Sequence, residues 1–174
     1  MKINKIIPIL TIVMISVLMI TPVFANGTNY YSDLIAGQDE DNPVGEVYIY
    51  FDNDHTMMYV EYVTWECPII ETHLWAGTDL EDAPKTKSGN PKIGHFPEVP
   101  TQVLANNVLY EIPVTIGQTI FILAHAVVDC PSIGEETAWG EGRWSTQFGR
   151  GTDDTFFGAR WGYYLTVEVT EPND

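Results

Sequence analysis

Residues 119–128 read TIFILAHAVV, and this stretch decides the fold. Both of its alternating sets of positions are apolar, so it predicts a central strand that is buried on both faces. His125 lies between Ala124 and Ala126 in this run. A buried imidazole needs a hydrogen-bond partner and favours the neutral form. We therefore expect His125 to be a structural residue.

The segments around this strand alternate between apolar and polar positions. Residues 45–51 place Val47, Ile49 and Phe51 on one face, and the DNDH sequence at 52–55 supplies turn chemistry before a second β-rich run at 57–64. This is the pattern of a β-hairpin. Further strands are expected at 71–76, 108–114 and 161–170.

The remaining segments predict loops rather than helices. No stretch after residue 25 keeps a sustained 3.6-residue apolar period. Residues 26–43 predict an arm with a small apolar patch, and residues 78–107 predict a long loop. The glycine-rich stretch 134–158 predicts a loop or a short irregular strand. The pattern indicates an all-β fold, specifically a single antiparallel β-sandwich of about six or seven strands with long Gly/Pro-rich loops.

Residues 1–25 have the features of a cleaved signal peptide. Lysines precede an apolar run that ends at Ile20, and Ala25 closes a Val-Phe-Ala sequence of the kind that signal peptidase cleaves. The run is shorter than the roughly 20 apolar residues that span a bilayer. We expect residues 26–174 to form one acidic domain that is secreted or held at the cell surface, with no stable membrane insertion after cleavage.

The net charge of the chain limits the classes of partner that it can bind. Asp and Glu number 24 against 8 Lys and Arg, and the formal net charge is −16. Such a field repels phosphate backbones and anionic lipid headgroups. Nucleic acid is therefore excluded as a partner, and cations or basic surfaces are favoured.

The chain contains two cysteines, Cys67 and Cys130. An isolated pair in an exported protein favours a disulfide. Neither cysteine has the CxxC or CxxH neighbour that a zinc site requires. We predict a Cys67–Cys130 bridge, which the chain-entropy model values at about 4 kcal/mol.

Several motifs in series resemble a family of secreted or cell-surface microbial β-domains. They are DLIAGQ (33–38), ETHLWAG (71–77), GNPKIGHF (89–96), AHAVV (124–128), ETAWGEG (136–142) and WGYYLTV (161–167). The resemblance covers nearly all of the chain after the leader. It implies export and a single β-domain. No biochemical activity is established for that family, so the resemblance implies no catalytic residues.

A candidate binding site follows from the predicted disulfide. The bridge would tether the segments that follow the two cysteines, and each of these segments carries a Glu-Thr pair. We therefore expect a cluster at one end of the sheet. Its predicted members are Glu71, His73, Glu136, Thr137 and Glu141.

A metal site formed by Glu71, His73 and His125 is one interpretation of these residues. If the disulfide joined directly opposed positions of two antiparallel strands, His73 would face Ala124, and the two histidines would point to opposite sides of the sheet. A slip of one residue would reverse this. The register therefore favours two separate structural histidines.

Acidic clusters permit a calcium site built from loops, because calcium takes six to eight oxygen ligands. They lie at Asp39-Glu40-Asp41, Asp52-Asn53-Asp54, Asp79 with Glu81-Asp82, and Asp153-Asp154. The second cluster lacks the glycine and the final glutamate of an EF-hand. No other cofactor is expected.

Tryptophans could stack on sugar rings where they are exposed. Of the five in the chain, Trp75 and Trp161 fall in strand patterns and are expected in the core. Trp139 and Trp144 lie in the glycine-rich segment and are expected at the surface.

These observations favour a non-catalytic secreted or cell-surface module that binds a ligand or has a structural role, with a glycan or a cell-surface protein as partner. Motifs such as GxSxG, SxxK and HExxH do not occur. One alternative is a cation-dependent hydrolase of extracellular glycans that uses carboxylates around Glu71 and Glu136. Another is an extracellular filament subunit whose N-terminal patch inserts into a neighbour. The oligomeric state stays open.

Overall fold

The computed structural model describes residues 30–37, 43–141, 145–148 and 161–172. Its strands are β1 (Tyr30–Ala36), β2 (Pro43–Phe51), β3 (Met57–Thr64), β4 (Ile69–Gly77), β5 (Gln102–Leu104), β6 (Asn107–Pro113), β7 (Thr119–Cys130), β8 (Gly134–Glu141), β9 (Ser145–Phe148) and β10 (Gly162–Glu168). Within the described residues the helices are two short 3₁₀ turns, η1 (Leu80–Asp82) and η2 (Ile93–His95). Neither is long and apolar enough to cross a membrane. The predicted leader lies outside the described residues.

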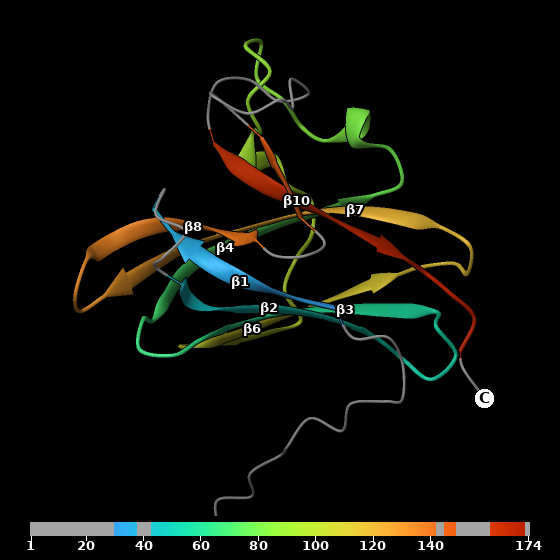
Figure 1. Ribbon diagram of the computed structural model, residues 1–174, viewed down its shortest axis with the longest axis horizontal. Helices are drawn as coiled ribbons and strands as arrows, with labels where there is room; N and C mark the ends of the chain where they lie inside the picture. The colour runs from blue at the N-terminus through green and yellow to red at the C-terminus, as the bar shows by residue number, and fades with distance from the viewer. Residues whose placement is uncertain (1–29, 38–42, 142–144, 149–160, 173–174) are drawn as a thin grey trace, which may run out of the picture.

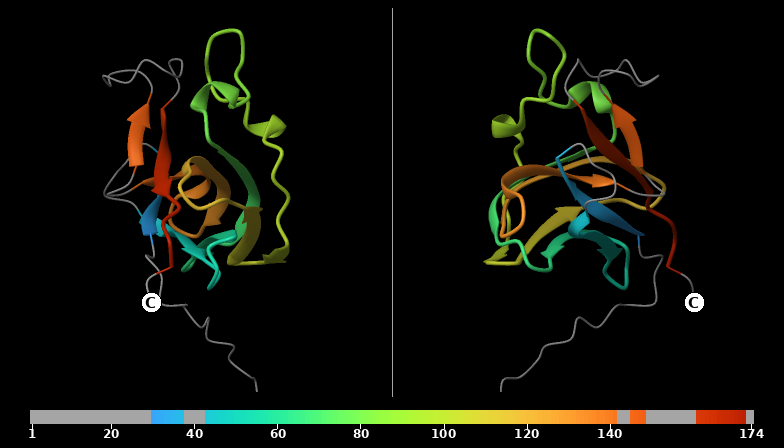
Figure 2. Two further views of the ribbon diagram at one scale, coloured as in Figure 1. Left: turned by 90° about the vertical axis from the view of Figure 1, so that its right-hand side faces the viewer. Right: turned by 60° about the vertical axis from the view of Figure 1, so that its left-hand side comes forward.

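The described strands form one antiparallel sheet in the order β5-β6-β3-β2-β1-β8-β7-β10-β9, and β4 pairs with β7. The sheet curls into a half-barrel, so that β4, β7, β8 and β10 lie on one side of the core and β2, β3 and β6 on the other (Figures 1 and 2). The all-β prediction is confirmed. The half-barrel does not confirm a sandwich of two sheets.

The apolar stretch at 119–128 forms most of β7, which lies at the centre of this sheet. On one edge, β7 pairs with β4 from Phe121 to Val128. On its other edge it pairs first with β10 and then with β8. Its side chains pack into the main apolar core on one face and into a second, smaller apolar cluster on the other, so the strand is buried on both faces, as its doubly apolar sequence predicts.

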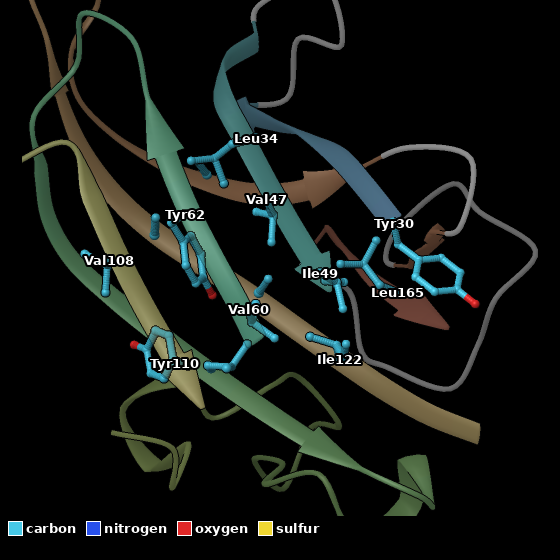
Figure 3. Close-up of a cluster of buried hydrophobic side chains, with 14 of the residues drawn as sticks. Tyr30, Leu34, Val47, Ile49, Val60, Tyr62, Val108, Tyr110, Ile122 and Leu165 are labelled. Atoms are coloured by element: carbon cyan, nitrogen blue, oxygen red, sulfur yellow. The ribbon is translucent and has the colours of Figure 1, made fainter. Parts of the chain in front are cut away.

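The main core fills the concave side of the curl (Figure 3). Tyr62 and Tyr110 are among its largest fully buried side chains. The Tyr62 hydroxyl donates a hydrogen bond to the His73 carbonyl at 3.2 Å, and the Thr72 and Tyr110 hydroxyls lie 2.8 Å apart. These contacts tie β3 and β6 to β4 across the core.

Three segments differ from the sequence prediction, and one of them is the expected loop 78–107, which contains β5. The expected arm contains β1, which pairs with β2 on one side and β8 on the other. The glycine-rich stretch contains the strand β8, in which Gly140 approaches the Ser32 hydroxyl so closely that a Cβ would lie 3.2 Å from it. Glycine here permits close strand packing instead of a loop.

The predicted hairpin is confirmed as β2 and β3. Asp52 stabilises the turn, because its carboxylate accepts hydrogen bonds from the backbone N–H groups of Thr56 and Met57 and from the Thr56 hydroxyl. His55 adopts a positive φ of 49° and places Nδ1 2.6 Å from the Thr170 carbonyl. This contact fastens the turn to the segment after β10.

Candidate functional site

The predicted disulfide is present and sets the start of the β4–β7 pairing. Cys67 and Cys130 are bonded, with their Cα atoms 4.3 Å apart. Ile69 lies opposite Val128, which is the register that the disulfide implies. The register then shifts by one residue between Ile69 and Glu71. Ile70, 54% exposed, is the additional residue of this β-bulge.

The bulge overturns the predicted separation of the two histidines. After it, His73 lies opposite His125, and His125 in turn lies opposite Trp139 of β8. Residues opposed in antiparallel strands point to the same face. The two imidazole centroids are 5.7 Å apart, and the His125 and Trp139 ring centroids are 4.9 Å apart. We call His73, His125 and Trp139 the histidine ladder.

The histidine ladder lies on the face of β4, β7 and β8 that points away from the main core, because Leu74, Ala124 and Ala138, which neighbour its members in these strands, belong to that core. A second, smaller apolar cluster covers part of this face. It joins Trp75, Leu123 and Trp139 to Leu80 and Ala83 of the loop after β4. The ladder is thus partly shielded from solvent by that loop.

His125 is buried, as predicted, with 4% of its surface exposed. Burial, and secondarily the positive charge that His73 would carry, lowers the pKa of His125 to about 3, so the ring is neutral at pH 7. Its Nδ1 atom has no hydrogen-bond partner among the described residues. An unsatisfied buried polar atom costs about 1–3 kcal/mol.

His73 is less buried and has a carboxylate neighbour. Glu71 Oε1 lies 3.2 Å from His73 Nε2, and 20% of the His73 side chain is exposed. This contact requires a proton on Nε2, which leaves the lone pair of a neutral ring on Nδ1. The predicted proximity of Glu71 and His73 is therefore seen.

The other predicted site residues are only partly gathered. Thr137 and Glu71 both flank Val127, so they share a face but are separated by β7. Glu136 is adjacent to Thr137 in β8 and so points to the opposite face. Glu141 lies at the far end of β8, opposite Asp33. Trp144 lies outside the described residues.

The expected surface position of Trp139 is wrong, because only 4% of it is exposed. The prediction rested on the glycine-rich composition of the segment, but residues 134–141 form a regular strand that pairs with β7. Trp75 is buried as expected. The exposed tryptophan among the described residues is Trp65, at 55%. It borders a hollow of about 220 Å³ beside the disulfide, with Pro43 among the other lining residues.

The described acidic clusters already have structural partners. Asp52 caps its own turn, and Asp79 accepts a hydrogen bond from the backbone N–H of Glu81 at 2.9 Å. Glu81 pairs with Lys85 at 2.9 Å. Within the described ranges, no three His, Cys, Asp or Glu side chains are grouped so that they could hold a metal ion. The clusters Asp39–Asp41 and Asp153–Asp154 lie outside those ranges.

A second candidate surface lies on the convex side of the half-barrel, on β1, β2, β3 and β6. Register places Tyr31, Tyr48 and Glu61 in one cross-strand row, and Tyr50, Tyr59 and Glu111 in the next. The Tyr50 and Tyr59 rings are stacked, with centroids 5.1 Å apart and 17° between their planes. We call the four tyrosines, with Glu46, Glu61 and Glu111, the tyrosine face.

Carboxylates hold the tyrosine rings in place. The Tyr48 hydroxyl donates to Glu46, and the Tyr50 hydroxyl donates to Glu61 at 3.2 Å. The hydrogen bond to Glu46, together with burial and the charges of Glu46 and Glu61, raises the pKa of Tyr48 to about 12. Burial and Glu61 likewise raise the pKa of Tyr50. The hydroxyls therefore stay protonated, and the rings are restrained.

The strands that carry the tyrosine face contribute no positive charge to it. The sequences of β1, β2, β3 and β6 contain no lysine, arginine or histidine. Tyr31 is 62% exposed, and Tyr48, Tyr50 and Tyr59 are half-buried. Reasoning from the sequence did not select this surface. The sequence pattern that indicates it is the alternation of tyrosines with core residues in 45–51.

Comparisons of the chain with protein-family models, with curated proteins and with solved structures gave no match. The resemblance drawn from the sequence motifs therefore stays a prediction.

Proposed function

We propose that this protein is a non-catalytic, extracellular binding module that recognises an uncharged polysaccharide through the tyrosine face. One observation carries the proposal: four tyrosines and three carboxylates are held in adjacent cross-strand rows of one convex sheet surface. In this proposal the half-barrel is the rigid scaffold that holds the tyrosine face, the role that the sequence analysis gives to a two-layered β-sandwich.

The chemistry of the tyrosine face suits a sugar chain. The faces of pyranose rings are apolar and stack on aromatic side chains, while carboxylates accept hydrogen bonds from sugar hydroxyls. Because Glu46 and Glu61 restrain the Tyr48 and Tyr50 rings, little side-chain entropy would be lost on binding. The absence of basic residues in these strands, with the net charge of −16, disfavours an anionic glycan.

The hydrolase and filament alternatives receive less support. Glu71 and Glu136 point to opposite faces of the sheet, so they do not form a pair around one glycosidic bond. The patch that would insert into a neighbour is β1, with Leu34 and Ile35 buried in the same chain. A binding role requires neither a pair of catalytic carboxylates nor an exposed N-terminal patch.

Sedimentation with insoluble cellulose, chitin, xylan and mannan tests the proposal. We expect binding to at least one of them that persists in 0.5 M NaCl, since stacking is not screened by salt. Tyr31→Ala and Tyr50→Ala should each weaken binding about tenfold or more. Trp65→Ala is the matched control, because it removes an exposed aromatic ring outside the tyrosine face.

The outcomes distinguish the possible surfaces and partners. Loss of binding in Trp65→Ala but not in the tyrosine variants would move the site to the hollow beside the disulfide. Binding to none of the polysaccharides, together with salt-sensitive binding to polylysine, would replace the glycan with a cationic partner. Either result would overturn the proposal as stated.

A further inference from the structure

We propose that His73 and His125 chelate a divalent transition-metal ion of the Zn²⁺ class, and that Glu71 orients His73 for this role. The proposal concerns the outer face of β4 and β7 and does not depend on the tyrosine face. It follows from the bulge at Ile70, which brings the two histidines opposite each other.

The spacing of the imidazoles fits a chelate. Zinc binds histidine nitrogen at about 2.0–2.1 Å, so two imidazoles on one ion have ring centroids about 5 to 6 Å apart. The observed separation is 5.7 Å. Both rings project from opposed positions of two paired strands, a rigid base that fixes their separation before any ion binds.

The hydrogen bonding of the two histidines leaves a nitrogen atom of each ring available to bind a metal ion. A ligating histidine commonly donates its other ring N–H to a carboxylate, which fixes the tautomer and raises the basicity of the ligand. Glu71 Oε1, 3.2 Å from His73 Nε2, is placed for this. The Nδ1 atom of His125 has no hydrogen-bond partner among the described residues, although it is buried. A bound ion would satisfy such an atom.

The donor set selects the kind of ion. Neutral imidazoles suit Zn²⁺, Cu²⁺ and Ni²⁺, whereas Ca²⁺ and Mg²⁺ take oxygen ligands. In the part of the chain that the structure describes, no third His, Cys, Asp or Glu joins the group as a ligand. The site is therefore a two-histidine chelate, in which water would complete the coordination of the ion. His73, with 20% of its side chain exposed, is the histidine of the pair that solvent reaches.

Calorimetric titration of the full chain with ZnCl₂ tests the site, using protein prepared without a histidine tag and treated with a chelator. We expect about one Zn²⁺ per chain. Affinity should fall at least tenfold in His73→Gln and in His125→Gln. It should fall about 10- to 100-fold in Glu71→Gln, as is typical when the carboxylate behind a ligating histidine is lost. His95→Gln, in η2, is the control and should bind as the wild type does.

A second measurement does not depend on whether His125→Gln folds. Electron paramagnetic resonance of the wild-type protein with one equivalent of Cu²⁺ should show two coordinating nitrogens, and His73→Gln should show one. Absence of stoichiometric Zn²⁺ binding would overturn the proposal. So would unchanged affinity in His73→Gln, an equal loss in His95→Gln, or competition by millimolar Ca²⁺. These results do not bear on polysaccharide binding, which involves other residues.

Discussion

Glu98 shows how a single carboxylate can oppose folding. It lies in the segment between η2 and β5, close enough to the buried Tyr110 that its negative charge contributes to the raised pKa of that tyrosine. Partial burial raises the pKa of Glu98 itself. A raised pKa means that the folded protein holds the proton more tightly than the unfolded chain. Ionisation of Glu98 therefore lowers stability as the pH rises through its folded-state pKa.

We expect Glu98→Gln to raise the thermal midpoint at pH 7 and to leave it unchanged at pH 3, where both side chains are neutral. The gain should stay below about 1 kcal/mol, because the carboxylate is only partly desolvated. Thermal unfolding followed by circular dichroism at the two pH values measures this. Glu171→Gln removes the same charge from an exposed position and should have the smaller effect at pH 7. Equal effects of the two substitutions would show that only net charge matters.

At the residue scale, the sequence predicts burial where an apolar run is unbroken, and it does not predict burial where glycines interrupt the pattern. His125 lies in a continuous apolar run, and the prediction that it is buried is confirmed. Trp139 lies between glycine-containing segments, and its burial escapes prediction, because it depends on β8 pairing with both β1 and β7. The residues around Trp139 do not indicate which strands β8 pairs with.

At the scale of elements, close packing of β2 against β3 imposes glycine at position 45. A Cβ added to Gly45 would lie 2.1 Å from the Val63 carbonyl oxygen and 2.8 Å from the Thr64 Cα. Both are backbone atoms, which cannot move aside without disturbing the hairpin. We expect Gly45→Ala to lower the free energy of unfolding by about 1–3 kcal/mol or more, measured by urea denaturation.

Gly94 provides the comparison for this substitution. A Cβ there would have no atom within 4 Å, and the residue lies in η2 with no positive φ. Gly94→Ala should therefore be neutral or slightly stabilising, since it reduces the entropy of the unfolded chain. If Gly45→Ala were tolerated as well as Gly94→Ala, the close approach of β2 and β3 would be refuted.

The bulge at Ile70 marks the limit of sequence reasoning about elements. The composition of β4 predicts its position, and the disulfide supplies a register that is correct at Ile69. One additional residue then reverses the faces of all later side chains of the strand. Isoleucine at position 70 does not indicate a bulge in the sequence. Only the structure therefore shows that His73 lies opposite His125.

Charge has the largest influence at the scale of the whole molecule. With a formal net charge of −16, the folded chain repels itself, and salt screens that repulsion. The thermal midpoint should rise between 10 mM and 0.5 M NaCl, and equally in KCl, because screening depends on ionic strength. A midpoint that falls with salt would contradict this. A rise in CaCl₂ beyond that in NaCl of equal ionic strength would indicate a calcium site.

The two ends of the described domain lie together. The Tyr30 hydroxyl at the start of β1 donates to the Glu168 carbonyl at the end of β10, at 3.3 Å. The domain could be inserted into a surface loop of another protein without stretching that loop.

Circular permutation tests this arrangement. A glycine–serine linker of about six residues, spanning roughly 13 Å, should join residue 172 to Tyr30. New termini would lie between the exposed residues Lys87 and Ser88. We expect the permutant to unfold cooperatively within about 10 °C of the parent, because no strand is cut. Without such a transition, the adjoining ends would not be interchangeable, and chain order itself would be part of what specifies this fold.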